Sequence, residues 1–183
     1  NEYDAADRLI RSTLPEVTRS LVDRTTGTAA ATQVQPFMLT GYNTFGEVTQ
    51  TQDLNGNVTR TERDKLGRPS KITHPAYTNP DAPATTVTPT EIFNYDANGN
   101  LISRVDRRGK TTTFDFDRRN RVIRQTDPLA AAGAVAGVTR TFYDDMGNVT
   151  KTVNQEGAVV EATYDALYRQ ITTREHVNNI TGT

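Results

Sequence analysis

A short unit with the outline Tyr-Asp-x-x-Gly-Asn recurs along the 183-residue chain, as in "YDANGN" from Tyr95 and "YDDMGN" from Tyr143. The equivalent units begin at Tyr3, Tyr42, Arg63, Phe116 and Tyr164. Within the pairs 42/63, 95/116 and 143/164 the units are 21 residues apart, and another turn lies between the two members of each pair. One turn every ten or eleven residues leaves about seven residues for each intervening segment, which is strand length. The repeat therefore predicts a meander of short antiparallel strands.

The residues of these turns fit a hairpin. An Asp at the first position can accept a hydrogen bond from a backbone N–H two residues on, and a Gly at the fourth position can take a positive φ. This combination is typical of a type I turn closed by a bulge. The predicted structural turn residues are Asp53, Gly56, Asp96, Gly99, Asp106, Gly109, Asp144, Gly147 and Gly157.

Hairpin geometry also assigns a role to the aromatic position. The residue before the turn Asp should face the residue two places after the Gly, because the two lie opposite each other on paired strands. The predicted cross-strand pairs are Tyr42 with Val48, Tyr95 with Leu101, Phe116 with Val122, and Tyr143 with Val149. Arg63 with Pro69 and Tyr164 with Gln170 depart from the aromatic–aliphatic pattern, so we expect those hairpins to be held less firmly.

Composition limits the possible functions. Hydrophobic residues make up 34% of the chain, so we expect a sheet that is half covered by other residues and half exposed to solvent, rather than a thick hydrophobic core. A net charge of -1 with interspersed Arg and Asp argues against nucleic acid as a partner. No apolar stretch approaches the ~20 residues of a membrane span, which predicts no membrane insertion. Cysteine is absent, which excludes disulfides and thiolate metal sites.

Three stretches interrupt the repeat. Each begins at a proline seven residues after an arginine, and because proline cannot donate to a sheet ladder, the strands should end there in register. The predicted irregular loops are 15–33, 75–89 and 128–137. Turn counting places all three on one edge of the sheet. Long loops on a repeat scaffold often carry function.

The units "YDANGNLI", "YDDMGNVT", "YDAADRLI" and "RDKLGRPSKI" resemble the YD repeats of the RHS family, which includes bacterial polymorphic-toxin shells, the C component of insecticidal toxin complexes and teneurins. The resemblance covers nearly the whole chain outside the three loops. It implies an all-β fold in which antiparallel hairpins wind as a solenoid or shell fragment, often around an enclosed toxin polypeptide. Family shells commonly carry an autoprotease with paired Asp-Pro motifs. Here Asp127-Pro128 is the sole Asp-Pro, and that activity is not inferred.

The carboxylates could suggest the acid–base pair of a glycosidase, but most of them open turns, and turn structure is the favoured interpretation. Alternating oxygens at 53/55/57 and 96/98/100 raise the possibility of calcium, yet no EF-hand or RTX pattern is present. His74 and His176 lie far apart in sequence and near no nucleophile motif. We therefore predict no catalytic residue, no metal site and no cofactor.

Four arginines, at 8, 68, 121 and 169, follow turns and face the turn aspartates. Cross-strand ion pairing is the favoured interpretation, and a row of arginines facing a polar ligand is the alternative. Candidate ligand-binding residues are Arg68, Arg121 and Tyr77.

The prediction is a non-enzymatic structural module of an extracellular or cell-surface YD-repeat shell or fibre, forming a single array over residues 1–183 that is an excerpt of a longer repeat protein. The alternative is a carbohydrate-binding adhesion module that uses the loops at 15–33, 75–89 and 128–137. Expected partners are further YD repeats of the same chain, or a second copy joined edge to edge into a filament, together with an encapsulated polypeptide or a surface glycan. Secretion is inferred from the family resemblance.

Overall fold

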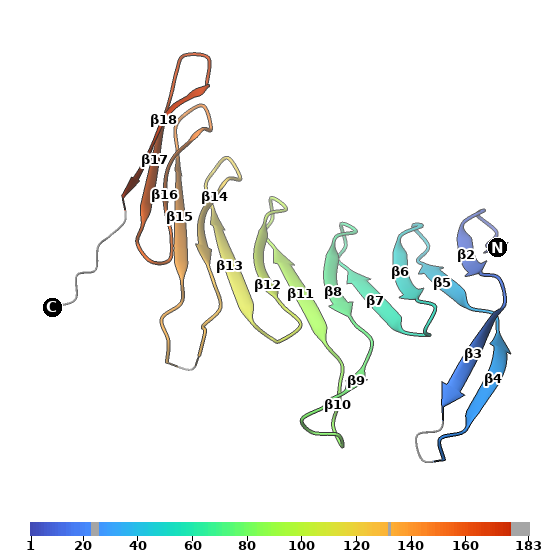
Figure 1. The fold of residues 1–183 in the computed structure, drawn as a ribbon. Helices are drawn as coiled ribbons and strands as arrows, with labels where there is room; N and C mark the ends of the chain where they lie inside the picture. Colours follow the sequence, from blue (N-terminus) through green and yellow to red (C-terminus); the bar gives the residue numbers. More distant parts are fainter. Residues whose placement is uncertain (23–25, 132, 177–183) are drawn as a thin grey trace. The chain divides into compact units, whose positions relative to one another are not determined.

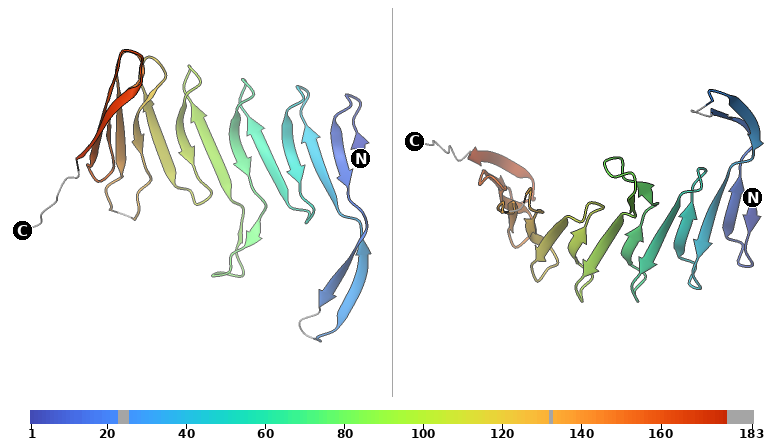
Figure 2. Two further views of the ribbon diagram at one scale, coloured as in Figure 1. Left: turned by 45° about the horizontal axis from the view of Figure 1, so that its top comes forward. Right: turned by 90° about the horizontal axis from the view of Figure 1, so that it is seen from below.

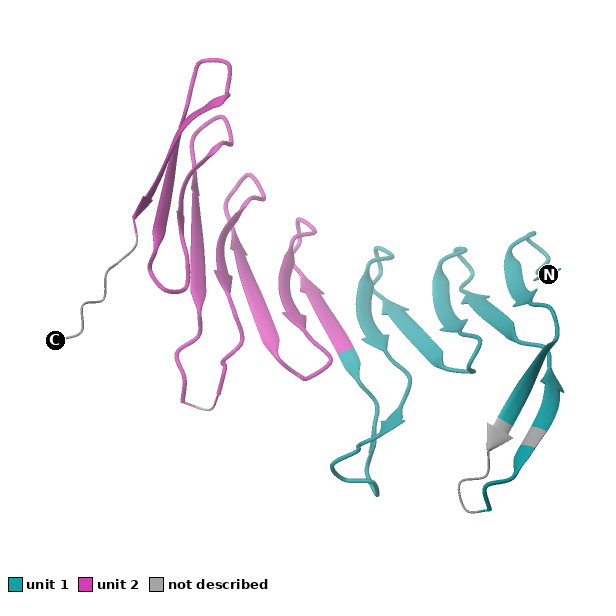
Figure 3. Cartoon of the chain, viewed as in Figure 1, with its two compact units in different colours: residues 1–90 teal, residues 91–183 magenta. Residues whose placement is uncertain are grey.

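The computed structural model describes residues 1–22, 26–131 and 133–176, without the side chains of residues 21, 22 and 30. These residues contain strands and turns but no helix. They form two compact units, Asn1–Thr90 and Glu91–Thr183 (Figure 3). In both units the sheet strands are antiparallel, which confirms the predicted all-β hairpin repeat.

In unit 1 the sheet strands follow one another in chain order, as expected of a meander (Figure 1). They are β1 (Glu2–Tyr3), β2 (Leu9–Thr13), β5 (Phe37–Tyr42), β6 (Val48–Gln52), β7 (Val58–Arg63) and β8 (Pro69–Thr73). Tight turns join β1 to β2, β5 to β6 and β7 to β8 at one end of the strands, here called the turn side. The opposite end, the loop side, carries the β6–β7 turn and two projections (Figure 1).

The projections of unit 1 correct the sequence prediction, because the segments 15–33 and 75–89 are not irregular. The first forms the two-stranded sheet of β3 (Val17–Val22) and β4 (Ala29–Val34), and the second contains β9 (Tyr77–Thr78) paired with β10 (Thr86–Val87). Pairing of the two short strands with each other satisfies backbone groups of each segment independently of the main sheet. The proline boundaries indicated where the main strands stop, but they did not exclude a second hairpin beyond.

In unit 2 the sheet strands also follow chain order. They are β11 (Thr90–Tyr95, which starts at the last residue of unit 1), β12 (Leu101–Val105), β13 (Thr111–Phe116), β14 (Val122–Thr126), β15 (Val138–Tyr143), β16 (Val149–Val153), β17 (Val159–Tyr164) and β18 (Gln170–His176). The loop 128–137 lies at the same end of the strands as the turns at Gly109 and Gly157 (Figure 1). Its described residues contain no strand.

Each of the three segments is closed at its base by a backbone hydrogen bond from the residue that precedes the proline. Leu14 N donates to Pro36 O at 2.8 Å, and His74 N donates to Pro89 O at 2.9 Å. Asp127 N donates to Gly137 O at 2.8 Å. The strand ladder therefore continues to the proline boundary, so the length of the segment beyond it does not disturb the repeat.

Neither unit contains a hydrophobic core among its described residues. No apolar side chain there is buried, and the one buried polar residue is Glu91, which is 7% exposed. The main-sheet strands of each unit lie side by side in one layer, from which the β3–β4 and β9–β10 projections of unit 1 extend (Figure 2). Because a single layer cannot hide its side chains, its stability must come from contacts between neighbouring strands.

Candidate functional site

The turn aspartate organises each hairpin through both carboxylate oxygens, as the β13–β14 turn illustrates. Oδ1 of Asp117 accepts from the backbone N–H of Arg119 at 2.8 Å and of Arg121 at 3.0 Å. The backbone N–H of Asn120, at φ 60°, donates to Asp117 O. The predicted turn positions Asp53, Asp96, Asp106 and Asp144 accept the same pair of backbone bonds. At Asn43 and Asn154 an amide oxygen takes the same place.

The fifth turn residue engages the second carboxylate oxygen. Arg121 places Nε 2.7 Å and Nη2 2.6 Å from Oδ2 of Asp117. Arg8 and Arg68 make the same contacts with Asp4 and Asp64. Where the fifth residue is Asn, its Nδ2 donates instead, as from Asn100 to Asp96 and from Asn148 to Asp144. This is the cross-strand ion pairing that the sequence favoured, together with a neutral substitute for it.

These hydrogen bonds lower the pKa of the turn carboxyls. A hydrogen bond donated by the fifth turn residue is the largest cause of each lowered pKa. At Asp117 the donor is the Arg121 side chain, and at Asp106 it is the Lys110 backbone N–H. The full set with a lowered pKa is Asp4, Asp53, Asp64, Asp96, Asp106, Asp117, Asp144 and Asp165. A general acid needs a raised pKa, so the direction of these shifts fits hydrogen-bond acceptors in turns.

The tyrosine of the motif ties its hairpin to the preceding one. The hydroxyl of Tyr143 donates to the carbonyl of Val122 at 2.9 Å, and that of Tyr164 donates to Val149 at 2.9 Å. In unit 1 the hydroxyl of Tyr42 donates to Leu9 at 3.1 Å. Each acceptor lies beyond the last registered pair between the two hairpins, where the ladder has ended. The tyrosine thus satisfies a carbonyl that the strand pairing leaves free.

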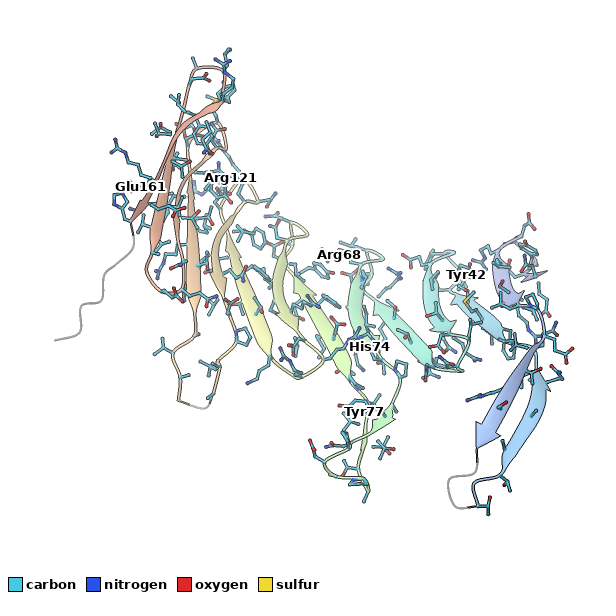
Figure 4. All side chains as sticks on the ribbon, viewed as in Figure 1. Tyr42, Arg68, His74, Tyr77, Arg121 and Glu161 are labelled. Atoms are coloured by element: carbon cyan, nitrogen blue, oxygen red, sulfur yellow. The ribbon has the colours of Figure 1, made fainter. Side chains whose placement is uncertain are left out.

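The arginine of the preceding hairpin completes this contact. Arg121 lies over the ring of Tyr143 at 4.3 Å and donates through Nη1 to Asp144 O at 3.1 Å. Arg8 lies over Tyr42 at 4.7 Å and donates to Asn43 O at 3.3 Å (Figure 4 labels Tyr42 and Arg121). We call the combination of turn aspartate, following arginine and next-hairpin tyrosine the clasp. Sequence reasoning missed it, because it paired the tyrosine only within its own hairpin.

Two departures from the motif keep the hairpins tied. Arg63 occupies a tyrosine position, yet its Nη2 donates to Val48 O at 3.2 Å and its Nη1 to Gly67 O at 2.8 Å. Arg63 thus donates to the preceding hairpin as the motif tyrosine does, and whether this hairpin is held less firmly stays a prediction. Phe116 has no hydroxyl, and there Asn100 Nδ2 donates to Asn120 Oδ1 of the next turn at 2.8 Å.

The predicted cross-strand residues lie opposite one another. The registered pairs are Tyr42 with Val48, Tyr95 with Leu101, Phe116 with Val122, and Tyr143 with Val149. The turn glycines at 56, 99, 109, 147 and 157 all have positive φ. Tyr168 takes the equivalent position at φ 60°, the left-handed region that a tyrosine rarely adopts.

The candidate ligand-binding residues belong to both units, Arg68 and Tyr77 to unit 1 and Arg121 to unit 2. Arg121 is occupied by the clasp, and Arg68 is held by Asp64. Tyr77 lies on the β9–β10 projection, 51% exposed, with His74 at the base of that projection (Figure 4). At the base of the β3–β4 projection there is an open cleft of about 630 Å³, whose apolar lining includes Val17, Val34 and Phe37.

Across residues 1–22, 26–131 and 133–176, no group of three or more His, Cys, Asp or Glu side chains is placed to hold a metal ion. The same residues include no helix long and apolar enough to cross a membrane. His74 belongs to unit 1, whereas His176 belongs to unit 2 and lies 3.8 Å from Glu161.

The sequence and the fold were compared with known proteins. A family model described as RHS Repeat matches residues 95–132, which confirms the resemblance over that segment. No curated protein matches the sequence.

Three solved structures share the fold at 16% identity. The crystal structure of TcdB2-TccC3-TEV aligns with a TM-score of 0.67 over 94% of this chain and 9% of that one. The crystal structure of TcdB2-TccC3-Cdc42 gives 0.66 over 93% and 9%. The structure of the Photorhabdus luminescens Tc holotoxin pore, with a TccC3 mutation, gives 0.63 over 91% and 8%. The chain thus spans less than a tenth of the length of these structures.

Proposed function

We propose that this chain is a non-enzymatic structural module in the wall of an extracellular or cell-surface shell. The match of residues 95–132 to the RHS Repeat model and the fold shared with the TccC3-containing structures support this proposal. The observation that carries the proposal is the single-layer sheet, in which the described residues bury no apolar side chain. The clasp, and the hydrogen bonds from Arg63 and Asn100 where it is absent, join hairpin to hairpin without help from a core. This construction suits an extended wall, because each added hairpin needs only its neighbour.

The proposed partners follow from the same construction. A single layer leaves many large apolar side chains exposed, among them Phe142 at 46% and Tyr3 at 54%. Exposed apolar surface on this scale marks contact with other protein. We assign these contacts to further repeats of a longer chain, of which residues 1–183 form one array, or to a second copy joined edge to edge, and to a polypeptide enclosed by the wall.

Protease protection tests this function in the longest natural chain that contains these residues. The wall should shield an enclosed polypeptide from protease. Opening the clasp with Arg121→Gln and Tyr143→Leu together should expose that polypeptide, whereas Arg60→Gln, on an exposed arginine outside the clasp, should not. Equal proteolysis of every segment in the unaltered chain would contradict the proposal.

The alternative function is a carbohydrate-binding adhesion module, and two observations favour it. The exposed Tyr77 on the β9–β10 projection could stack on a sugar ring, and the cleft beside Val17 is lined by both apolar and polar groups. A glycan array separates the two functions. Specific binding that is lost when residues 75–89 are shortened would favour the adhesion module, and an array without binding would count against it.

A further inference from the structure

Most hairpins carry a complementary polar pair at one fixed register, two residues before and seven residues after the first turn residue. In unit 1 these pairs are Glu2 with Arg11 and Glu62 with Lys71, each at 3.1 Å. In unit 2 they include Asn94 with Ser103 at 2.8 Å and Thr163 with Thr172 at 2.6 Å. Directly opposed residues of antiparallel strands share a face, so each pair satisfies its own polar groups.

Arg140, four residues before the turn residue Asp144, lies next to one of these pairs in unit 2. At this register Asp115 lies opposite Arg124, and on the other side of β14 Arg124 lies opposite Arg140. The ion pair between Asp115 and Arg124 is long at 3.5 Å, and the residues opposite Arg140 on the two neighbouring strands are Arg124 and Val153. Within the described part of the chain the guanidinium of Arg140 makes no hydrogen bond or ion pair. Like charges placed directly opposite each other are destabilising, so this arrangement needs an explanation.

An open cleft of about 410 Å³ lies over these two arginines. Its lining includes Asp115, Arg124 and Arg140 together with Ile123 and Phe142. Ile123 is 38% exposed and Phe142 46% exposed. Phe142 is two residues from Arg140 on β15, which places both side chains on the same face of the sheet. Arginine beside an exposed aromatic ring is the composition enriched in protein–protein contacts.

We propose that this cleft binds an extended acidic polypeptide segment, with one side-chain carboxylate seated between Arg124 and Arg140 and an apolar side chain two residues along the segment against Phe142. A carboxylate would match the guanidinium fork and remove the repulsion between the two arginines. A small inorganic anion would neutralise the charge but leave Phe142 exposed. Residues i and i+2 of an extended peptide share one face, so an acidic residue and an apolar residue two places along match the spacing of Arg140 and Phe142 on β15. The inference concerns binding by unit 2 alone and does not depend on enclosure by a shell.

Fluorescence anisotropy with a labelled peptide that carries Glu and Phe two residues apart, with Ser between them, tests the proposal on the purified protein. Binding should weaken as salt is raised, since exposed charges are screened. Arg140→Gln should weaken it about tenfold, the loss expected for one charge-assisted contact, and Arg140→Lys should weaken it less. Without peptide, the melting temperature of the Arg140→Gln variant should be unchanged or higher, because a like-charge contact has been removed.

Arg60 provides the matched control. It is also an exposed strand arginine without a hydrogen bond or ion pair among the described residues, but Gln50 and Thr73 lie opposite it. Arg60→Gln should leave peptide affinity unchanged. Equal loss from Arg60→Gln and Arg140→Gln, equal binding of a Gln–Phe peptide, or no binding of the Glu–Phe peptide would each overturn the proposal. Displacement of the peptide by acetate at the same carboxylate concentration would reduce the site to a simple anion site and would also overturn it.

Discussion

The guanidinium of Arg121 lies 4.3 Å from the centre of the Tyr143 ring, although the two residues belong to successive hairpins. The same arginine holds Asp117 in its own turn and donates to Asp144 O in the next. One side chain therefore links the geometry of one turn to the position of the following hairpin. This explains why a protein without a buried apolar core in its described residues can use one short motif as its unit of assembly.

The tyrosine hydroxyl should contribute measurably to stability. Tyr143→Phe keeps the ring beneath Arg121 but removes the hydrogen bond to Val122 O, so the free energy of unfolding should fall by about 1 kcal/mol. Chemical denaturation followed by circular dichroism measures this change. Tyr77→Phe is the control, because Tyr77 is 51% exposed and its hydroxyl has no partner within the described residues, and it should have little effect.

Arg63 occupies a tyrosine position of the motif, so tyrosine should replace it with little loss of stability. Arg63→Tyr retains a donor that can reach Val48 O, so its unfolding free energy should stay within about 0.5 kcal/mol of the parent. Arg63→Leu loses every donor and should be less stable by about 1 to 2 kcal/mol. A tyrosine variant as unstable as the leucine variant would mean that Arg63 acts by some means other than this hydrogen bond.

Tyr168 should be a site of removable strain. Its φ of 60° lies in the region where asparagine is better tolerated than tyrosine. Tyr168→Asn should raise the free energy of unfolding by up to about 1 kcal/mol, even though it gives up the contact between the hydroxyl and Met146 Sδ. Leu167→Asn, at the neighbouring exposed position, should not stabilise the protein. Equal effects at the two positions would show that the backbone conformation is not the cause.

Acid should weaken the turns. Each turn carboxyl has a pKa below its ordinary value, chiefly because the fifth turn residue donates to it, so the folded state favours the ionised form. The resulting stability is present above the pKa of the unfolded chain and is lost as the pH falls below about 4. The melting temperature, measured by thermal unfolding, should therefore be nearly constant from pH 5 to 7 and fall steeply below pH 4.

Asp144→Asn provides the matched variant for this acid effect. Asn43 and Asn154 already open turns with an amide oxygen, so the fold should tolerate the change. The variant should lose less stability than the parent between pH 5 and pH 3, because one titrating group has been removed. A parallel decrease in both proteins would argue that the turn at Asp144 does not contribute to acid unfolding.

The sequence predicted the strands and their register because the repeat imposes them. Asp96 and Gly99 determine a turn, and a turn of known type determines that Tyr95 lies opposite Leu101. The clasp could not be predicted in this way, since the contact between Tyr143 and Val122 O depends on where the ladder between two hairpins ends. The β3–β4 projection was missed although a signal was present, because Val17–Val22 and Ala29–Val34 flank Gly27 as two strand-like runs.

A double-mutant cycle on Arg121 and Tyr143 tests the central claim most directly, which is that the motif residues join one hairpin to the next. The unfolding free energies of Arg121→Gln, Tyr143→Leu and the double variant would be measured against the parent chain. A coupling energy of about 0.5 to 2 kcal/mol is predicted, from the cation–π contact between the two side chains. Additive effects, with a coupling energy indistinguishable from zero, would contradict the claim.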